Sequence, residues 1–150
     1  LSNKTDTLDS YDLSSIEHLS VFGNSYVSLD VQLLTNMKSL TLGNSNCTAV
    51  LSGTVPNLEE LYLQSTRVQF SSSFYAPNLK KLRIYGMRAA VSLHWIQHCP
   101  ITELHVSCTD IDTSTLALPQ TVEQLTLFRC SLDCDIQPRS APQSQGNRPT

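Results

Sequence analysis

The sequence predicts an α/β-type solenoid: a short right-handed arc with a parallel β-sheet on its concave face and irregular, 3-10 or short helical segments on its convex face. Three observations predict this fold: an apolar motif at a nearly constant period, an alternation of apolar and polar residues within each copy, and prolines close to the starts of the units. The six copies of the spacing apolar-x-x-apolar-x-apolar begin at Ile16, Met37, Leu58, Leu79, Ile101 and Val122. The steps between them are 21, 21, 21, 22 and 21 residues, and self-similarity at such a period is typical of stacked repeats.

Each copy of the motif predicts one short strand. In the third copy, Leu61 and Leu63 alternate with polar or amphipathic neighbours, so that one face of the strand is apolar. A unit of 21 residues is too short for a strand, a long helix and two loops. Because each return segment brings the chain back to the same end, successive strands are expected to be parallel neighbours.

The turn after each strand carries a small, mostly polar residue three positions beyond the last apolar residue of the motif. Such a side chain can face inward and bond amide groups that the turn leaves unpaired. The six residues at this position are Asn24, Ser45, Thr66, Met87, Thr109 and Cys130. Met87 does not suit this role, so the fourth turn is expected to differ.

The return segments carry a second apolar set that is expected to close the core from the outer side. Most are irregular, but residues 88–98 place apolar residues at roughly helical spacing and predict a short helix. That helix is expected to end at Cys99-Pro100, since proline cannot continue it. Proline ahead of a strand removes no interior hydrogen bond of the sheet, and its recurrence supports the register. The prolines ahead of the motif copies are Pro56, Pro77, Pro100 and Pro119.

The repeated pattern resembles that of the leucine-rich repeat family. The family's spacing L-x-x-L-x-L-x-x-(N/C/S/T)-x-L fits most of residues 13–135. Residues 95–104 look like the cysteine-containing type seen in F-box adaptors. Residues 118–125 are more similar to the short proline-led units of bacterial effectors and some protist proteins. The two likenesses point to different subfamilies.

The chain divides into three parts on composition. Residues 1–12 are mostly polar and are interpreted as an N-terminal cap or lead-in, and residues 13–136 form the repeat domain of about six repeats. Residues 137–150 contain three prolines and many amide side chains, and are predicted to be a disordered tail. Candidate glycosylation sequons begin at Asn3 and Asn46.

Composition argues against several classes of partner. Only 15% of the residues are charged and the net charge is −3, a weak field that disfavours nucleic acid and anionic membranes. The longest apolar runs fall far short of the roughly 18 to 20 residues that a membrane-spanning helix needs.

No motif in the chain predicts an enzyme, a cofactor or a metal site. His94 and His98 have the spacing of a zinc-binding helix, but Trp95 stands where the H-E-x-x-H motif requires glutamate. His105 and Cys108 are three residues apart and would lie on opposite strand faces. The sequence contains neither Gly-x-Ser-x-Gly nor a glycine-rich phosphate loop.

Five cysteines give an odd number without a C-x-x-C pair, which favours small buried residues over a disulfide framework. A pairing of Cys130 with Cys134 across a turn is the alternative. The five are Cys47, Cys99, Cys108, Cys130 and Cys134.

The outward side chains of the predicted sheet form the candidate binding surface, because identical positions stack in parallel neighbours. Exposed aromatic residues and arginine dominate the energy of protein interfaces. The candidate residues on this concave face are Phe22, Tyr62, Gln64, Arg83, Tyr85, His105 and Phe128. The predicted function is therefore non-catalytic recognition of another protein. The alternative is a structural or end-capping segment of a larger leucine-rich-repeat protein, such as an F-box-type adaptor, a secreted pathogen effector or a surface protein.

Overall fold

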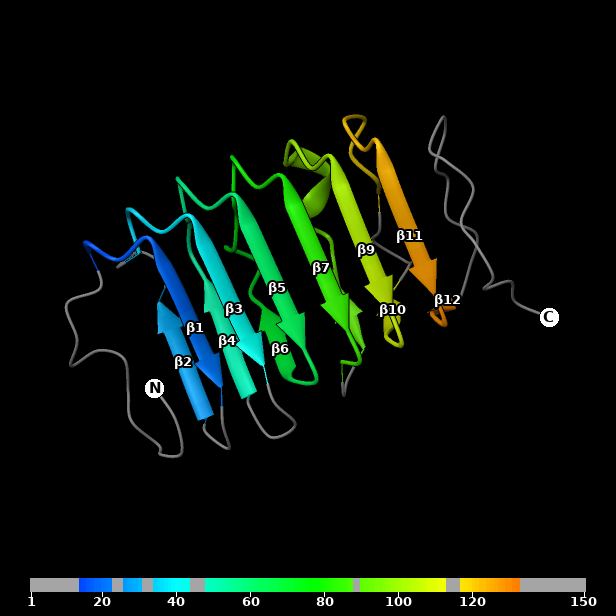
Figure 1. The fold of residues 1–150 in the computed structure, drawn as a ribbon, viewed down its shortest axis with the longest axis horizontal. Helices are drawn as coiled ribbons and strands as arrows, with labels where there is room; N and C mark the ends of the chain where they lie inside the picture. Colours follow the sequence, from blue (N-terminus) through cyan, green and yellow to red (C-terminus); the bar gives the residue numbers. More distant parts are fainter. Residues whose placement is uncertain are drawn as a thin grey trace.

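The chain winds as a parallel β-solenoid, with one strand for each copy of the apolar motif (Figure 1). The computed structural model describes residues 14–22, 26–30, 34–43, 48–87, 90–112 and 117–132. Six strands form one sheet in the order β1-β3-β5-β7-β9-β11. Their bounds are β1 (His18–Phe22), β3 (Ser39–Gly43), β5 (Glu60–Gln64), β7 (Lys81–Tyr85), β9 (Glu103–Ser107) and β11 (Gln124–Phe128).

The predicted register of this sheet is confirmed. The second apolar residue of each motif lies directly beside its equivalent in the next coil, and so does the third. These stacked residues are buried along most of the sheet, and they form one continuous core with the first motif residues. The ladder of second residues comprises Leu19, Leu40, Leu61, Leu82, Leu104 and Leu125.

The return segments are mainly extended, so the α/β-type description is not confirmed. They pair with one another in two further parallel sheets, β2-β4-β6 and β12-β10-β8. Identical positions stack there as well, and their backbones bond to the neighbouring coil instead of to a helix turn. The bounds are β2 (Tyr26–Asp30), β4 (Thr48–Ser52), β6 (Arg67–Phe70), β8 (Val91–Ser92), β10 (Asp110–Asp112) and β12 (Ser131–Leu132).

The short helix predicted over residues 88–98 is reduced to one 3-10 turn. Val91 and Ser92 form a strand that pairs with Ile111 and Asp112, and only η3 (Ile96–His98) is helical in this segment as far as it is described. Cys99 then takes an extended backbone, with φ −99° and ψ 147°. The proline that follows disfavours a helical conformation of the residue before it, so the turn ends there.

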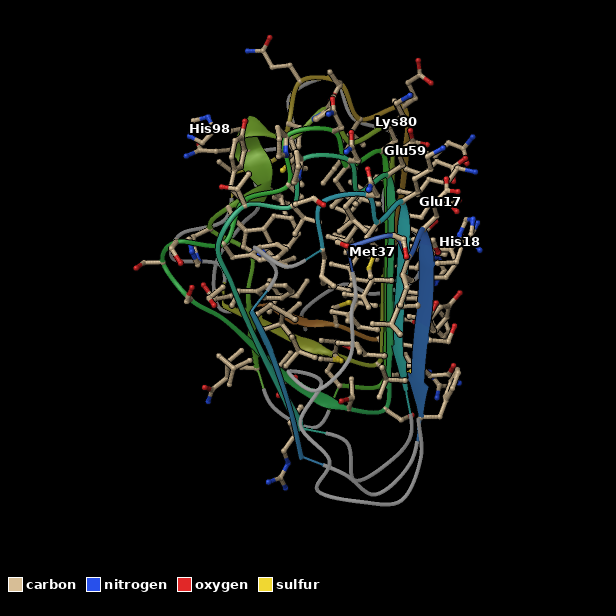
Figure 2. All side chains as sticks on the ribbon, turned by 90° about the vertical axis from the view of Figure 1, so that its left-hand side faces the viewer. Glu17, His18, Met37, Glu59, Lys80 and His98 are labelled. Atoms are coloured by element: carbon tan, nitrogen blue, oxygen red, sulfur yellow. The ribbon has the colours of Figure 1, made fainter. Side chains whose placement is uncertain are left out.

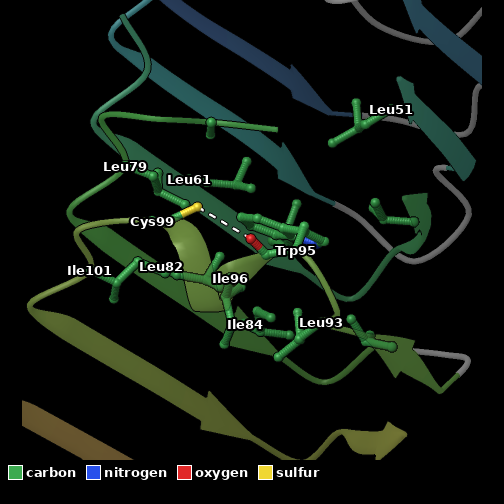
Figure 3. Packing of buried hydrophobic residues seen from close by; sticks show 14 of the residues in the cluster. Leu51, Leu61, Leu79, Leu82, Ile84, Leu93, Trp95, Ile96, Cys99 and Ile101 are labelled. Carbon is green, nitrogen blue, oxygen red and sulfur yellow. Dashed lines mark hydrogen bonds between the residues drawn. The ribbon is translucent and has the colours of Figure 1, made fainter. Parts of the chain in front are cut away.

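An aromatic cluster closes the core opposite the six-stranded sheet. Phe70, Phe74 and Trp95 lie with ring centroids 4.9 to 5.0 Å apart, in the tilted and edge-on arrangements that aromatic pairs prefer. Cys99 is buried beside them and donates its Sγ hydrogen to the carbonyl of Trp95 at 3.5 Å (Figure 3). Burial raises the pKa of the Cys99 thiol to about 11. Cys99 and Cys130 are buried, as predicted, whereas Cys108 is exposed.

Each described turn that leaves the six-stranded sheet places one residue in the left-handed region. Ser65, Gly86, Cys108 and Arg129 occupy this equivalent position with φ between 50° and 56°. The N–H groups of the first three donate to the last strand carbonyl of the next coil, each at 2.9 Å. The turn thus continues the hydrogen-bond ladder, but any residue other than glycine is strained there by about 1 to 2 kcal/mol.

The inward-facing residue that follows bonds the turn as predicted where Thr109 provides it. Its hydroxyl accepts the N–H of Met87 at 3.2 Å and donates to the carbonyl of Ser107 at 2.9 Å. Met87 is buried without offering a polar group of its own, so the neighbouring coil supplies the bond that its amide needs. This is how the fourth turn differs.

A ladder of amide side chains, not anticipated from the sequence, joins the coils where each motif begins. The Nδ2 groups of Asn36, Asn57 and Asn78 donate to the carbonyls of Ser14, Thr35 and Pro56 in the preceding coil, at 2.6 to 2.7 Å. Pro100 interrupts the ladder because it has no side-chain donor. One coil later, the Thr121 hydroxyl resumes it with a 2.7 Å bond to the carbonyl of Ile101.

Several predictions from the sequence concern residues outside the described ranges. These are the N-terminal cap at 1–12, the disordered tail at 137–150, the sequons at Asn3 and Asn46, and the thiols of Cys47 and Cys134.

Replacing Gly86 with alanine should lower the free energy of unfolding by about 1 kcal/mol, because φ is +55° at this position. The new Cβ would meet Ser65 Oγ at 3.6 Å, an ordinary contact, so the loss would come from backbone strain alone. Cys108→Gly relieves the same strain and should raise stability by about 0.5 kcal/mol after the added entropy of the unfolded chain. Urea unfolding monitored by Trp95 fluorescence measures both, and a neutral Gly86→Ala would contradict the strain argument.

Asn78→Ala should lower the free energy of unfolding by about 1 kcal/mol, since it removes the bond to the Pro56 carbonyl. Asn78→Asp should cost more at neutral pH, because a carboxylate would then face the carbonyl oxygen without a proton to donate. Gln69→Ala, at an exposed site of β6, is the matched control and should change stability by less than about 0.5 kcal/mol. Equal stability of the Asn78→Asp variant and the parent would show that the amide donor is dispensable.

Candidate binding face

All seven candidate residues lie on the six-stranded sheet at positions that alternate with the buried ladders. We call this outward side of the sheet, away from the core, the solvent face. The strand pairing places Tyr62 beside Arg83, and Arg83 beside His105. The same pairing sets Gln64 beside Tyr85, while Phe128 reaches the same row at β11. The predicted columns are therefore confirmed as an arrangement in space.

Arg83 lies at the centre of the solvent face between an aromatic ring and a carboxylate. Its Cζ is 5.4 Å from the centroid of the Tyr62 ring, within the range of a cation–π contact. Its Nη2 is 3.8 Å from Glu103 Oε2, a loose ion pair. With 45% of its side chain exposed, Arg83 is held in place but still accessible to a partner.

Tyr85 and His105 form a stacked pair next to Arg83. Their ring centroids are 4.9 Å apart with an interplanar angle of 35°, and Tyr85 remains 41% exposed. The pKa of His105 is lowered, first by burial of the imidazole and second by the positive charge of Arg83. The ring is therefore neutral at pH 7 and adds an uncharged flat surface beside the tyrosine.

Phe22 and Phe128 stand apart from this centre, on the first and last strands of the sheet. They are 47% and 44% exposed. Phe22 covers the backbone of Gly43 on the neighbouring strand, where an added Cβ would come within 2.7 Å of the ring. Arg129 places its Cζ 5.2 Å from the centroid of the Phe128 ring. The structure thus gathers the four central candidates and leaves the two phenylalanines as separate flanking rings.

A column of alternating charge borders the solvent face at the N-terminal ends of the strands. Glu17, Lys38, Glu59 and Lys80 occupy one position in successive coils, linked by backbone bonds such as Lys38 N–H to the Glu17 carbonyl at 2.7 Å. Figure 2 shows Glu17, Glu59 and Lys80 on the same side of the molecule. The Lys38 Nζ lies 3.0 Å from Glu17 Oε1, and this bond lowers the pKa of Glu17 and raises that of Lys38. The alternation of sign at the repeat period is the sequence signal that could have revealed the column.

The other chemistry considered from the sequence gains no geometry here. His94 is oriented by Ser92, whose Oγ is 3.1 Å from Nδ1, and the helix that would align His94 with His98 is absent from this described segment. No group of three or more potential metal-ligating side chains occurs in the described ranges. Within the same ranges, no helix has the length and apolar character needed to cross a membrane.

Comparison with known proteins gives no relative for this chain: no family model, no curated protein and no solved structure matches it significantly. What can be said of its class therefore comes from the coordinates, which define a repeat solenoid of parallel β-strands with an outward row of aromatic residues.

The apparent pKa of His105, read from its ring protons by NMR, should lie below its ordinary value of 6.5. Arg83→Ala should raise it by removing the second cause, while burial still holds it below that value. As the pH falls below about 6.5 the unfolded chain takes up the proton first, so His105 should make the fold less stable there. A titration unchanged by Arg83→Ala would show that the arginine charge does not reach the imidazole.

Proposed function

We propose that this chain is a leucine-rich-repeat-like recognition module that binds another protein through its solvent face and catalyses no reaction. The observation that carries the proposal is the distribution of exposed apolar side chains. Of the four large ones exposed in the described ranges, Phe22, Tyr85 and Phe128 lie on this one face, and Tyr75 lies elsewhere. Aromatic residues gathered on a regular surface are the groups that contribute most to protein interfaces.

The charges of the solvent face favour a protein over a nucleic acid. Lysine and arginine bind a phosphate backbone when they are free to replace its counterions. Here each of three cations already lies near a carboxylate: Lys38 near Glu17 at 3.0 Å, and Lys81 and Arg83 near Glu60 and Glu103 at 3.8 Å. These partly exposed pairs contribute little to stability, but they leave the face nearly neutral.

The arrangement of the central residues supports recognition because it lowers the entropy lost on binding. Tyr62, Arg83, Tyr85 and His105 project from paired strands and contact each other in two ring contacts. Side chains that are already ordered lose less rotamer freedom when a partner covers them. Arginine stacked on tyrosine also keeps N–H groups available for a partner's carbonyl or carboxylate groups.

A structural role within a larger repeat array is the second candidate function. It is favoured by contacts in which the same surface residues join neighbouring coils. Phe22 covers Gly43 on the next strand, and the Lys81–Glu60 and Arg83–Glu103 pairs each bridge two strands. In this role the aromatic residues would shield the sheet and have no partner.

Affinity capture with this chain as bait, followed by measurement of Kd for the captured protein, separates the two candidates. Tyr85→Ala and Arg83→Ala should each weaken binding by about 2 kcal/mol, roughly 30-fold, without changing the unfolding midpoint. Tyr75→Ala is the matched control, because it removes an exposed tyrosine outside the solvent face. Unchanged affinity in both face variants, or capture of the same proteins by a Tyr62/Arg83/Tyr85 triple-alanine bait, would favour the structural role.

A further inference from the structure

The three exposed rings of the solvent face lie in one row that crosses the strands. Phe22, Tyr85 and Phe128 occupy the last position of β1, β7 and β11, and the register makes these positions equivalent. In the order of the sheet, three strand intervals separate the first two rings and two intervals separate the last two. At about 4.8 Å per interval, the gaps are about 14 Å and about 10 Å.

An α-helix reproduces this pair of gaps. Three helical turns span about 16 Å and two turns about 11 Å, so the ratio of three to two is the same as that of the strand intervals. A helix inclined by about 27° to the row brings its pitch of about 5.4 Å into step with the strand spacing of about 4.8 Å. It would then drift by about 12 Å along the strands over the whole row, within the roughly 17 Å length of a five-residue strand.

An extended peptide does not fit the row equally well. Four residues, about 13 Å, match the first gap and keep both side chains on one face. The second gap needs about three residues, an odd number that turns the next side chain away from the sheet. Inclining the peptide to gain one pair of residues per strand requires about 44°, and it would then drift by about 23 Å, beyond the strand ends.

We propose that the solvent face receives an amphipathic α-helix of the partner, about six turns long, which crosses the strands with one turn per strand and its apolar stripe on Phe22, Tyr85 and Phe128. This inference rests on the proposed recognition function and specifies the partner's structure.

The charges of the face match the two polar flanks that such a helix has. On one side of the row lie Arg83 and Glu103, opposite charges that are 3.8 Å apart. On the other side Arg129 lies against Phe128, with its Cζ 5.2 Å from the ring centroid. A helix with an apolar stripe and mixed charges on both flanks would meet compatible groups on each side, whereas a uniformly charged helix would meet a repelling one.

Two displayed libraries of 21-residue peptides with matched composition test the inference. In the first, apolar residues follow the helical pattern i, i+4, i+7, i+11, i+14 and i+18; in the second, they alternate with polar residues. Both are selected on the 150-residue chain and counter-selected on its Tyr85→Ala and Phe128→Ala variants. Tyr75→Ala is the control, and unfolding midpoints verify that every variant folds.

Peptides of the helical pattern should be enriched, and their affinity should fall at least tenfold on Tyr85→Ala and Phe128→Ala and stay unchanged on Tyr75→Ala. A central proline in the selected peptides should cost a further tenfold or more, because it breaks the helix. Enrichment of the alternating library with the same dependence on Tyr85 would overturn the helix and leave the recognition function standing. Enrichment of neither library, or binding that ignores both variants, would overturn the docking inference, while the capture experiment decides separately whether the face binds a protein.

Discussion

The fold depends on one constraint: every coil must keep the same register with the next through the hydrogen bonds of the parallel sheet. Once the ladder is fixed, equivalent residues stack whatever their chemistry. The leucines then fill the core, the asparagines at Asn36, Asn57 and Asn78 cap preceding carbonyls, and residues at the left-handed turn accept strain. In such a quasi-one-dimensional structure each coil is stabilised mainly by its neighbours. The shift to 22 residues is absorbed between β7 and β9, since the register resumes unchanged at Lys81 and Glu103.

The six-stranded sheet could be predicted in detail because its signal is written twice, as a period of two within each strand and a period near 21 between strands. The convex side could not, since its segments lack either period at full strength. Residues 88–98 place apolar groups at helical spacing, yet tertiary pairing of Val91–Ser92 with the next coil prevails over that local preference. The asparagine ladder was missed for another reason: each asparagine stands beside a motif that already explained its neighbours.

The candidate face was predictable in position but not in its contacts. Register alone places Tyr62, Arg83 and His105 in one column. It does not reveal that Arg83 turns toward the tyrosine ring, or that His105 stacks diagonally on Tyr85, because both depend on rotamers. The lowered pKa of His105 follows from these contacts and was likewise invisible in the sequence.

The polar and aromatic residues of the solvent face divide the work of stability and recognition. Charged residues at the N-terminal ends of the strands pair across coils, which ties up their charge inside the surface. Toward the C-terminal ends, aromatic rings stay more than two-fifths exposed at Phe22, Tyr85 and Phe128. Compensated charge gives little long-range attraction, so a partner would be held mainly by apolar contact at short range. Such an interface should depend only weakly on salt and strongly on the shape of the element that lies across the strands.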